Sequence, residues 1–462
     1  MSRHPITRTI AALVAGLVAA LLAGAAVLAT AAPASAHVVP STVVEMDVHA
    51  SDIIADLVLP AEDLVTASGV DVPTSGELTG DAADQLAAYL EDHVAATSAA
   101  GTWDVAVADV ATTEVEQWGT GAFPAVTATA TLTPPDAADL RSFVLDYDAI
   151  VHQVVTADVY VVLRSDWAAG DVEGARTLGA ITTDTVTGEV PVLAVDLDEG
   201  SPWQGFTGMV ALGTSHIAEG TDHQLFLLTL LLPAPLLAAR RRWSGGVAGT
   251  GTAVRRITAI TIAFTLGHSV TLVAGALGLP VPQQPVEAAI AVSILVAAAH
   301  AVRPLFPGRE PLVAGLFGLV HGMAFSTTLS DLDLSGSQLV LSLLGFNLGI
   351  EIMQLAVVLL VLPPLVVLAR TPAYRYLRDG AALLTALAAT GWLLQRLGVD
   401  TPLGTAADSV GPATPWVALA LWVAAAAVVA RRRTGLDGNP DGAAGAPQQV
   451  EPPRVPAGGR AG

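Results

Sequence analysis

The chain has 462 residues, which is too many for one compact core, so at least two domains are expected. Hydrophobic residues make up 52% of the sequence and the mean hydropathy is +0.59, values typical of a membrane protein. The sequence contains no cysteine, which excludes a disulfide framework and thiolate ligands. Any metal site must therefore use histidine, carboxylate or carbonyl donors.

The formal net charge of −21 is concentrated in one region. Residues 37–200 contain 29 aspartates and glutamates but only three arginines, a net charge of −26, so the rest of the chain carries +5. An acidic polar half is thus joined to a mildly basic apolar half. Because phosphate binding needs clustered basic residues, this distribution argues against nucleic acid as a partner.

Residues 1–36 are typical of a secretory signal peptide, with a charged start, an apolar run and a small-residue cleavage site that ends at Ala36. An uncleaved anchor helix is the alternative. Cleavage after Ala36 would leave His37 at the mature N-terminus, where its amine and imidazole could chelate a cation such as copper. An N-terminal histidine is more often incidental.

Residues 37–200 are predicted to form a mostly β domain of the α+β class, outside the cytoplasm. Short runs alternate apolar with polar residues and are separated by Gly, Pro and Asp. The predicted strands are Val43–Val48, Ile53–Leu59, Trp103–Val110, Ala125–Leu132, Ala157–Arg164 and Val190–Leu197. Two helices are predicted, Ala82–Ala95 and a shorter one near Pro135–Phe143. Three histidines of this domain have no ligand-like spacing and are predicted to be surface or packing residues: His49, His93 and His152.

From Gly205 onwards the sequence becomes apolar, and residues 205–431 are predicted to form a membrane α-helical bundle of about seven transmembrane helices. A span needs about 20 apolar residues to cross a hydrocarbon core of about 30 Å. The candidate spans are 206–239, 257–279, 285–302, 311–329, 337–368, 380–397 and 414–430.

Arginines fall in alternate gaps between the candidate spans, and the positive-inside rule makes those gaps cytoplasmic. This places residues 37–200 outside and the C-terminus in the cytoplasm of a multi-pass plasma-membrane protein. Residues 434–462 are rich in Gly, Pro and Ala and lack apolar periodicity, so they are predicted to be a disordered cytoplasmic tail.

Ionisable side chains inside apolar spans are costly and usually mark an ion or substrate pathway. The second span contains His268, the fourth contains His321 and the fifth contains Glu351. Gly318 and Gly322 flank His321 with the spacing that lets a neighbouring helix approach closely. Two imidazoles and a carboxylate on three helices are hard to explain as packing, and they are predicted to belong to one functional site.

The first span begins with a cluster of potential metal ligands: His216, Asp222 and His223. The two histidines are seven residues apart, about 10.5 Å along a straight helix, which is too far for both rings to bind one ion. Two arrangements remain open: a helix break at Gly220-Thr221 that lets the side chains converge, or successive positions on a path. The length of the apolar run favours a break, because it would extend about 51 Å as one helix.

At these residues the apolar half resembles the HupE/UreJ family of small membrane proteins, in its branch with a large extracytoplasmic N-terminal domain. The matching stretches are HIAEGTDHQLFLL (216–228), FTLGHSVTL (264–272), VEAAIAVSI (286–294), FGLVHGMAF (317–325) and FNLGIEIMQL (346–355). The first is the most specific, because His-x5-Asp-His on a first span is the family's signature. The resemblance implies nickel or cobalt permeation alongside hydrogenase and urease maturation, and it makes His216, Asp222 and His223 metal-contacting candidates.

The sequence departs from the family at one position. Better-studied members carry a motif of the type His-Gly-x-x-His-Gly. His321-Gly322 matches its start, but Phe325 stands where the second histidine would be.

The sequence therefore predicts a permease for a divalent metal ion, not an enzyme. The ion, nickel-, cobalt- or zinc-like, is the expected substrate; no bound organic cofactor is expected, and no Walker motif for ATP is visible. The expected partners are the metal ion, the lipid bilayer and, by resemblance, a metal-delivery or metalloenzyme-maturation protein. The predicted metal ligands are His216, Asp222, His223, His268, His321 and Glu351. Two alternatives stay open: an intramembrane zinc-dependent hydrolase, and a membrane-anchored interaction protein without transport.

Overall fold

A computed structural model of the protein describes residues 39–73, 78–117, 120–135, 140–239, 242–279, 281–325, 329, 332, 334, 336–399, 401–408 and 413–433. The described chain forms two compact units. One comprises residues up to Asp166 together with Gly174–Glu199, and the other comprises Trp167–Glu173 together with the chain from Gly200 onwards. The predicted signal peptide, His37 and the predicted cytoplasmic tail lie outside the described residues.

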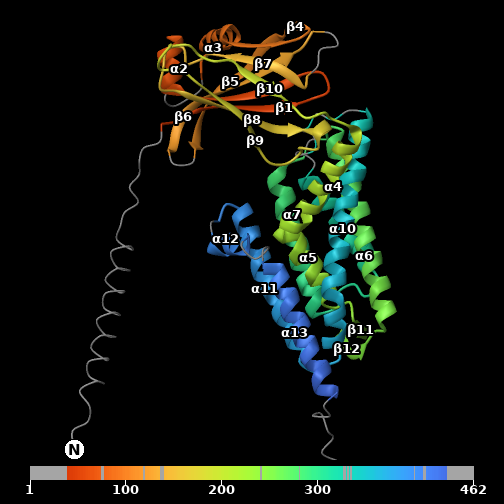
Figure 1. Ribbon diagram of the computed structural model, residues 1–462. Coiled ribbons are helices and arrows are strands. Elements are labelled where there is room, and N and C mark those ends of the chain that lie inside the picture. Colours follow the sequence, from red (N-terminus) through yellow and green to blue (C-terminus); the bar gives the residue numbers. More distant parts are fainter. Residues whose placement is uncertain are drawn as a thin grey trace, which may run out of the picture. The chain divides into compact units, whose positions relative to one another are not determined.

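The first unit contains two β-sheets (Figure 1). The larger has the order β5-β6-β2-β1-β8-β9, in which only β1 and β8 run parallel. Its strands are β1 (Thr42–Val48), β2 (Ile53–Pro60), β5 (Asp104–Gln117), β6 (Gly121–Thr133), β8 (Asp158–Asp166) and β9 (Arg176–Thr182). The smaller, of order β10-β7-β3-β4, consists of β3 (Val94–Ser98), β4 (Gly101–Thr102), β7 (Ser142–Tyr147) and β10 (Leu193–Asp196). Each of the six predicted runs contains or overlaps a strand, whereas β3, β4, β7 and β9 were not predicted.

Two helices accompany these sheets, α2 (Ala61–Ser68) and α3 (Gly80–His93). The side chains of Leu86 and Leu90 on α3 are completely buried in a core that also contains apolar residues from both sheets. Helix α3 confirms the predicted helix Ala82–Ala95, although the last two residues of that prediction begin β3.

The other predicted helix, near Pro135–Phe143, is wrong at its C-terminal end. Ser142 and Phe143 are the first residues of β7, and Phe143 is buried. Residues 136–139 of this prediction lie outside the described residues. The alternation of buried and exposed side chains in SFVLDY favours a strand over a helix, because one face of β7 packs on the core.

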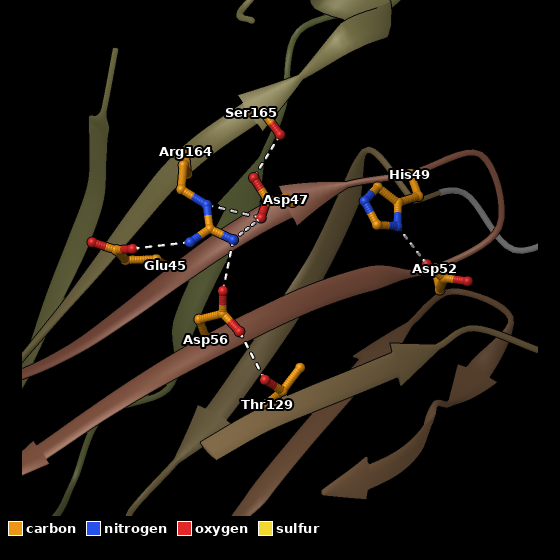
Figure 2. A network of polar contacts seen from close by, with 8 residues as sticks. All are labelled: Glu45, Asp47, His49, Asp52, Asp56, Thr129, Arg164 and Ser165. Atoms are coloured by element: carbon orange, nitrogen blue, oxygen red, sulfur yellow. Dashed lines mark hydrogen bonds and ion pairs between the residues drawn. The ribbon is translucent and has the colours of Figure 1, made fainter. Parts of the chain in front are cut away.

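An ion-pair network crosses four neighbouring strands of the larger sheet, from β8 through β1 and β2 to β6 (Figure 2). The guanidinium of Arg164 donates hydrogen bonds to three carboxylates, those of Glu45, Asp47 and Asp56. Asp47 is only 5% exposed and also accepts a hydrogen bond from Ser165 Oγ at 2.5 Å. The hydrogen bond between Arg164 and Asp47 raises the pKa of the Arg164 guanidinium above its ordinary value. The buried carboxylate thus depends on one permanently charged cation.

Replacing Arg164 with alanine should lower the free energy of unfolding by about 1–3 kcal/mol, because Asp47 loses its charged donor while it stays buried. A raised pKa contributes stability at every pH below the ordinary pKa of arginine, so the loss should be constant between about pH 6 and 8. Thermal unfolding of the purified full chain measures it. The double variant R164A/D47N should recover part of the loss, and equal unfolding of R164A and wild type would contradict this account.

The second unit is helical (Figure 1). Its longer elements are α4 (Pro202–Glu219), α5 (Thr221–Leu231), α6 (Thr250–Ala276), α7 (Gln283–Val302), α8 (Glu310–Ala324), α10 (Gly336–Leu368), α11 (Tyr374–Arg396), α12 (Pro402–Asp408) and α13 (Thr414–Arg433). A short hairpin, β11 (Leu236–Ala239) and β12 (Arg242–Val247), separates α5 from α6. Helix α4 packs against α10, α6 against α8, and α7 against α11.

Four of the described helices are long and apolar enough to cross a membrane, namely α6, α7, α10 and α13, while α8 is a shorter apolar helix of 15 residues. The predicted number of seven spans is therefore not confirmed. The first predicted span, 206–239, is not one helix: it is divided into α4 and α5, and its last four residues form β11. The division falls at Gly220, between His216 on one side and Asp222 and His223 on the other.

Candidate metal site

Helices α6 and α8 approach each other backbone to backbone through glycines. A Cβ atom added to Gly318 would clash with the carbonyl oxygen of Phe264, and one added to Gly322 would clash with that of His268. The predicted close approach at the Gly318–Gly322 step is confirmed. It holds His268 of α6 and His321 of α8 on tightly packed neighbouring helices.

Helices α4 and α10 are joined in the same way. An added Cβ would meet the carbonyl oxygen of Phe346 at Gly213, and that of Val210 at Gly349. His216 lies on α4, three residues after Gly213. The histidine is therefore fixed against α10 by contacts that leave no room for a side chain.

The chain breaks between α4 and α5 at Gly220, whose backbone angles are φ −65° and ψ 94°. The ring centroids of His216 and His223 are consequently 4.6 Å apart. A straight helix would separate them by about 10.5 Å, so the predicted break is confirmed. His216 also comes 14 residues after the start of α4, about 21 Å along the helix.

Side-chain hydrogen bonds hold the two sides of this break together. The side-chain amide of Gln224, in the first turn of α5, donates to the carbonyl oxygen of Ala218 in the last turn of α4. The same amide accepts a hydrogen bond from Thr414 Oγ1, and Thr221 Oγ1 donates to the carbonyl oxygen of Asp408 at 3.2 Å. The start of α5 is thus hydrogen-bonded to the end of α4, to the end of α12 and to the start of α13.

The break brings His216, His223 and His268 together. One donor atom from each residue lies within 4.8 Å of the other two. Their ring centroids are 6.1 Å apart for His216 and His268, and 6.4 Å apart for His223 and His268. Three imidazoles from α4, α5 and α6 therefore face one small volume.

A second group shares one histidine with the first and consists of Asp222, His223 and His321, again with donor atoms within 4.8 Å of one another. His223 Nδ1 lies 2.9 Å from Asp222 Oδ1, and His223 Nε2 lies 3.4 Å from His321 Nδ1. His321 Nε2 is hydrogen-bonded to Ser293 Oγ at 2.9 Å. Because Ser293 donates its only hydroxyl proton to the Ile290 carbonyl, His321 Nε2 must carry the proton and leave its Nδ1 lone pair toward His223.

One completely buried histidine, His268, has no hydrogen-bond partner among the described residues. His268 is 0% exposed, and within the described part of the chain neither of its ring nitrogens has a partner; the same holds for His216 Nε2. A neutral imidazole always has one N–H donor and one lone pair. Each unsatisfied polar atom costs about 1–3 kcal/mol. A metal cation would satisfy the lone pair of each imidazole, though not its N–H.

Glu351 belongs to neither group of potential ligands among the described residues. It is half-buried on α10. Its neighbours on the same helix face, Asn347 and Gln354, instead contact α6: Ser269 Oγ donates to Asn347 Oδ1 at 2.6 Å, and Thr265 Oγ1 donates to Gln354 Oε1 at 3.4 Å. Of the six predicted ligands, the structure brings five together and leaves Glu351 apart.

A cavity of about 410 Å³ opens onto the two groups. Its lining includes both histidines of the break and several carboxylates: His216, His223, Glu219, Asp222, Glu287 and Asp408. Glu287 is paired with Arg396 at 2.7 Å. Carboxylates around an opening that ends at imidazoles attract cations and repel anions.

Three residues around the cluster were not predicted as part of it. The ring of Phe325 lies 4.5 Å from that of His216 and stacks at 4.4 Å on Phe346. Phe346 in turn lies 5.4 Å from His216, and Ser293 positions His321. Phe325 could have been found from its place in the His-Gly-x-x-His pattern, but an apolar ring and a serine carry no sequence signal of their own.

Adding a methyl group at the α6–α8 contact should displace the histidines on both helices. The variant G322A is expected to lower the free energy of unfolding by about 1–3 kcal/mol, because the new Cβ would overlap the backbone of His268. Gly251, near the start of α6, has nothing within 4 Å of an added Cβ, so G251A is the matched control and should unfold like wild type. Thermal unfolding in detergent compares them, and equal midpoints for G322A and G251A would contradict the close contact.

A comparison with family models matches residues 194–396 to the family described as HupE / UreJ protein. No curated protein and no solved structure matches the chain. The matched segment contains all six predicted ligands and Phe325, and it excludes most of the β-rich unit.

Proposed function

We propose, on the premise that residues 194–396 belong to the HupE/UreJ family, that this chain is a permease for a divalent transition-metal ion of the nickel or cobalt type. The family is associated with metal transport and is of the transporter type, not an enzyme family. The ion is the cargo, and the residues that contact it are His216, Asp222, His223, His268 and His321, with Glu351 further along the path.

The unsatisfied nitrogens of His268 are the observation on which this proposal chiefly rests. Imidazole is a ligand for nickel, copper, zinc and iron, and mixed imidazole and carboxylate donors suit several divalent ions. A set of four imidazoles and one carboxylate offers enough donors to replace much of the water of such an ion. Ionisable side chains inside a membrane span are costly, which favours a function for these histidines and for Asp222.

The helix break supports a cation at this position for a second reason. The C-terminal end of a helix carries partial negative charge on its free carbonyl groups, and α4 ends at Glu219 beside the cluster. Transporters commonly place broken helices at their binding sites, with half-helix C-termini directed at cations. The dipole of α4 and the carboxylate of Asp222 therefore add to the pull of the imidazoles.

The two groups suggest how an ion moves. The ion enters through the carboxylate-lined cavity, binds His216, His223 and His268, and then exchanges donors while it keeps His223, the residue common to both groups. Such an exchange never leaves the ion without a ligand, which keeps the barrier between the positions low. Onward movement passes Glu351, and the membrane potential supplies about 2.3 kcal/mol per charge per 100 mV.

The arrangement in the membrane is part of the proposal. The broken pair α4–α5, together with α6, α7, α8, α10, α11 and α13, makes seven crossings in which α4 and α5 count as one. The alternation of arginine-bearing gaps then orients the chain with the β-rich unit outside and the C-terminus in the cytoplasm.

Metal uptake by cells tests the proposal. Cells that express the wild-type protein should accumulate more nickel or cobalt than cells with an empty vector, as measured by elemental analysis. The variant H223A should lose this excess, because His223 belongs to both ligand groups.

The control is H300A, a buried histidine of α7 that lies outside both groups and accepts a hydrogen bond from the Leu305 amide. It should retain uptake at equal protein abundance in the membrane. The proposal fails if wild type and H223A accumulate nickel, cobalt, zinc and copper to the same level.

The position of Phe325 gives a second prediction. An imidazole in place of this ring, 4.5 Å from His216, adds a donor at the edge of the first group. The variant F325H should bind nickel more tightly by about tenfold, or about 1.4 kcal/mol, and release it more slowly in uptake assays. Equilibrium dialysis compares F325H with F325L, which adds no donor. Equal nickel affinities for the two variants would place Phe325 outside the coordination sphere.

A further inference from the structure

A third group of potential metal ligands lies in the β-rich unit, far from the matched family segment in the sequence. It consists of His93, Asp148 and His152, and one donor atom from each lies within 4.8 Å of the other two. His93 is the last residue of α3, whereas Asp148 and His152 lie in the turn after β7. A separation of 55 residues hides this convergence in the sequence.

Hydrogen bonds in this group determine which ring nitrogens are free. His152 Nδ1 lies 3.0 Å from the backbone carbonyl oxygen of Asp148. A carbonyl oxygen only accepts, so Nδ1 carries the proton and the lone pair of His152 is on Nε2. His93 Nδ1 lies 2.6 Å from Asp148 Oδ1, and the carboxylate accepts the Nδ1 proton in the same way. In both rings the nitrogen that does not face an acceptor is Nε2, the atom available to a metal ion.

This is the pattern that surrounds metal-binding histidines. Such residues usually donate their other ring N–H to a carboxylate or a backbone carbonyl, which fixes the tautomer and the ring orientation. Here one residue, Asp148, supplies both acceptors. The rings of His93 and His152 are stacked, with centroids 4.3 Å apart and planes 13° from parallel. Because imidazole lone pairs lie in the ring plane, at least one ring must rotate toward the other for both to bind one ion.

The surrounding backbone holds the turn in a strained form. Ile150, between the two ligands of the turn, has a φ of +67°, which is rare for a β-branched residue. Its amide donates to the hydroxyl of Tyr89 at 2.9 Å, and the Asp148 amide donates to the carbonyl oxygen of His93 at 3.1 Å. Strain that persists because the surroundings impose it is found preferentially at functional sites.

We propose that His93 and His152 bind a divalent cation through their Nε2 atoms, with Asp148 as the acceptor that orients both rings. This second site is independent of the histidine cluster at the helix break. Imidazole pairs suit nickel, copper and zinc. His93 is 24% and Asp148 40% exposed, so the site is open to solvent and water can fill the remaining coordination positions of an ion. The C-terminal end of α3 adds negative potential. A site of this kind binds and releases an ion from solution.

The test uses the full-length protein in detergent with nickel as the probe. Modification of histidines by diethyl pyrocarbonate, followed by mass spectrometry, should show that nickel protects His93 and His152. His49 is the internal control: its Nδ1 lies 3.2 Å from Asp52, but it belongs to no ligand group among the described residues, and its modification should not change.

Variants separate this site from the two ligand groups that share His223. D148N should weaken protection of both histidines by about 10- to 100-fold in nickel concentration, because it removes the carboxylate that orients His93. In the variant H216A/H268A the protection should persist, whatever the outcome of uptake assays. The inference is overturned if His93 and His152 of the wild-type protein are modified to the same extent with and without nickel. It is also overturned if their protection by nickel disappears in H216A/H268A and not in D148N.

Discussion

The break in the chain at Gly220 is the feature on which the candidate site depends. Without it His216 and His223 would stand two turns apart on one helix, and the donors on α6 and α8 would face only one of them. The break has a cost, because it exposes the ends of two helices inside the bundle. Part of that cost is offset by hydrogen bonds from Gln224 to the carbonyl oxygen of Ala218, at the end of α4, and from Thr221 to the carbonyl oxygen of Asp408, at the end of α12. The nine residues from His216 to Gln224 thus contain the break, three of the candidate ligands and two of the side chains that stabilise the break.

The histidine cluster at the helix break lowers the stability of the fold, because it buries polar atoms without hydrogen bonds. His268 is completely buried with two unsatisfied nitrogens, and apolar rings, including Phe264 and Phe346, surround it. A protein selected for stability alone would place apolar side chains there. The Arg164 network of the β-rich unit differs in this respect, because every carboxylate in it has a partner. The polar groups of the Arg164 network are thus paired with one another, whereas the histidine cluster contains ring nitrogens without a hydrogen-bond partner among the described residues.

Much of the candidate site could be predicted from the sequence, because its elements are local. The seven-residue spacing of His216 and His223 and the length of the apolar run together favoured a helix break, and the Gly318–Gly322 step favoured a close helix contact. Both features are present. Predictions that needed long-range information were incomplete. Glu351 is an ionisable residue in an apolar segment, yet it lies outside both ligand groups of the described residues. His93 and His152 looked unremarkable in the sequence because only the packing of α3 against the turn after β7 brings them together.

The glycine contacts have a mechanical consequence. Helices whose backbones touch cannot tilt or slide past each other without a clash, so α6 with α8, and α4 with α10, each behave as one rigid body. His268 and His321 belong to the first body and His216 to the second, while His223 rides on the short helix α5. Distances within a body are fixed, and those between His216 and the other imidazoles change with any relative rotation. A relative rotation of the two bodies would therefore change the distance of His216 from the other imidazoles, and with it the number of imidazoles that can contact a bound ion.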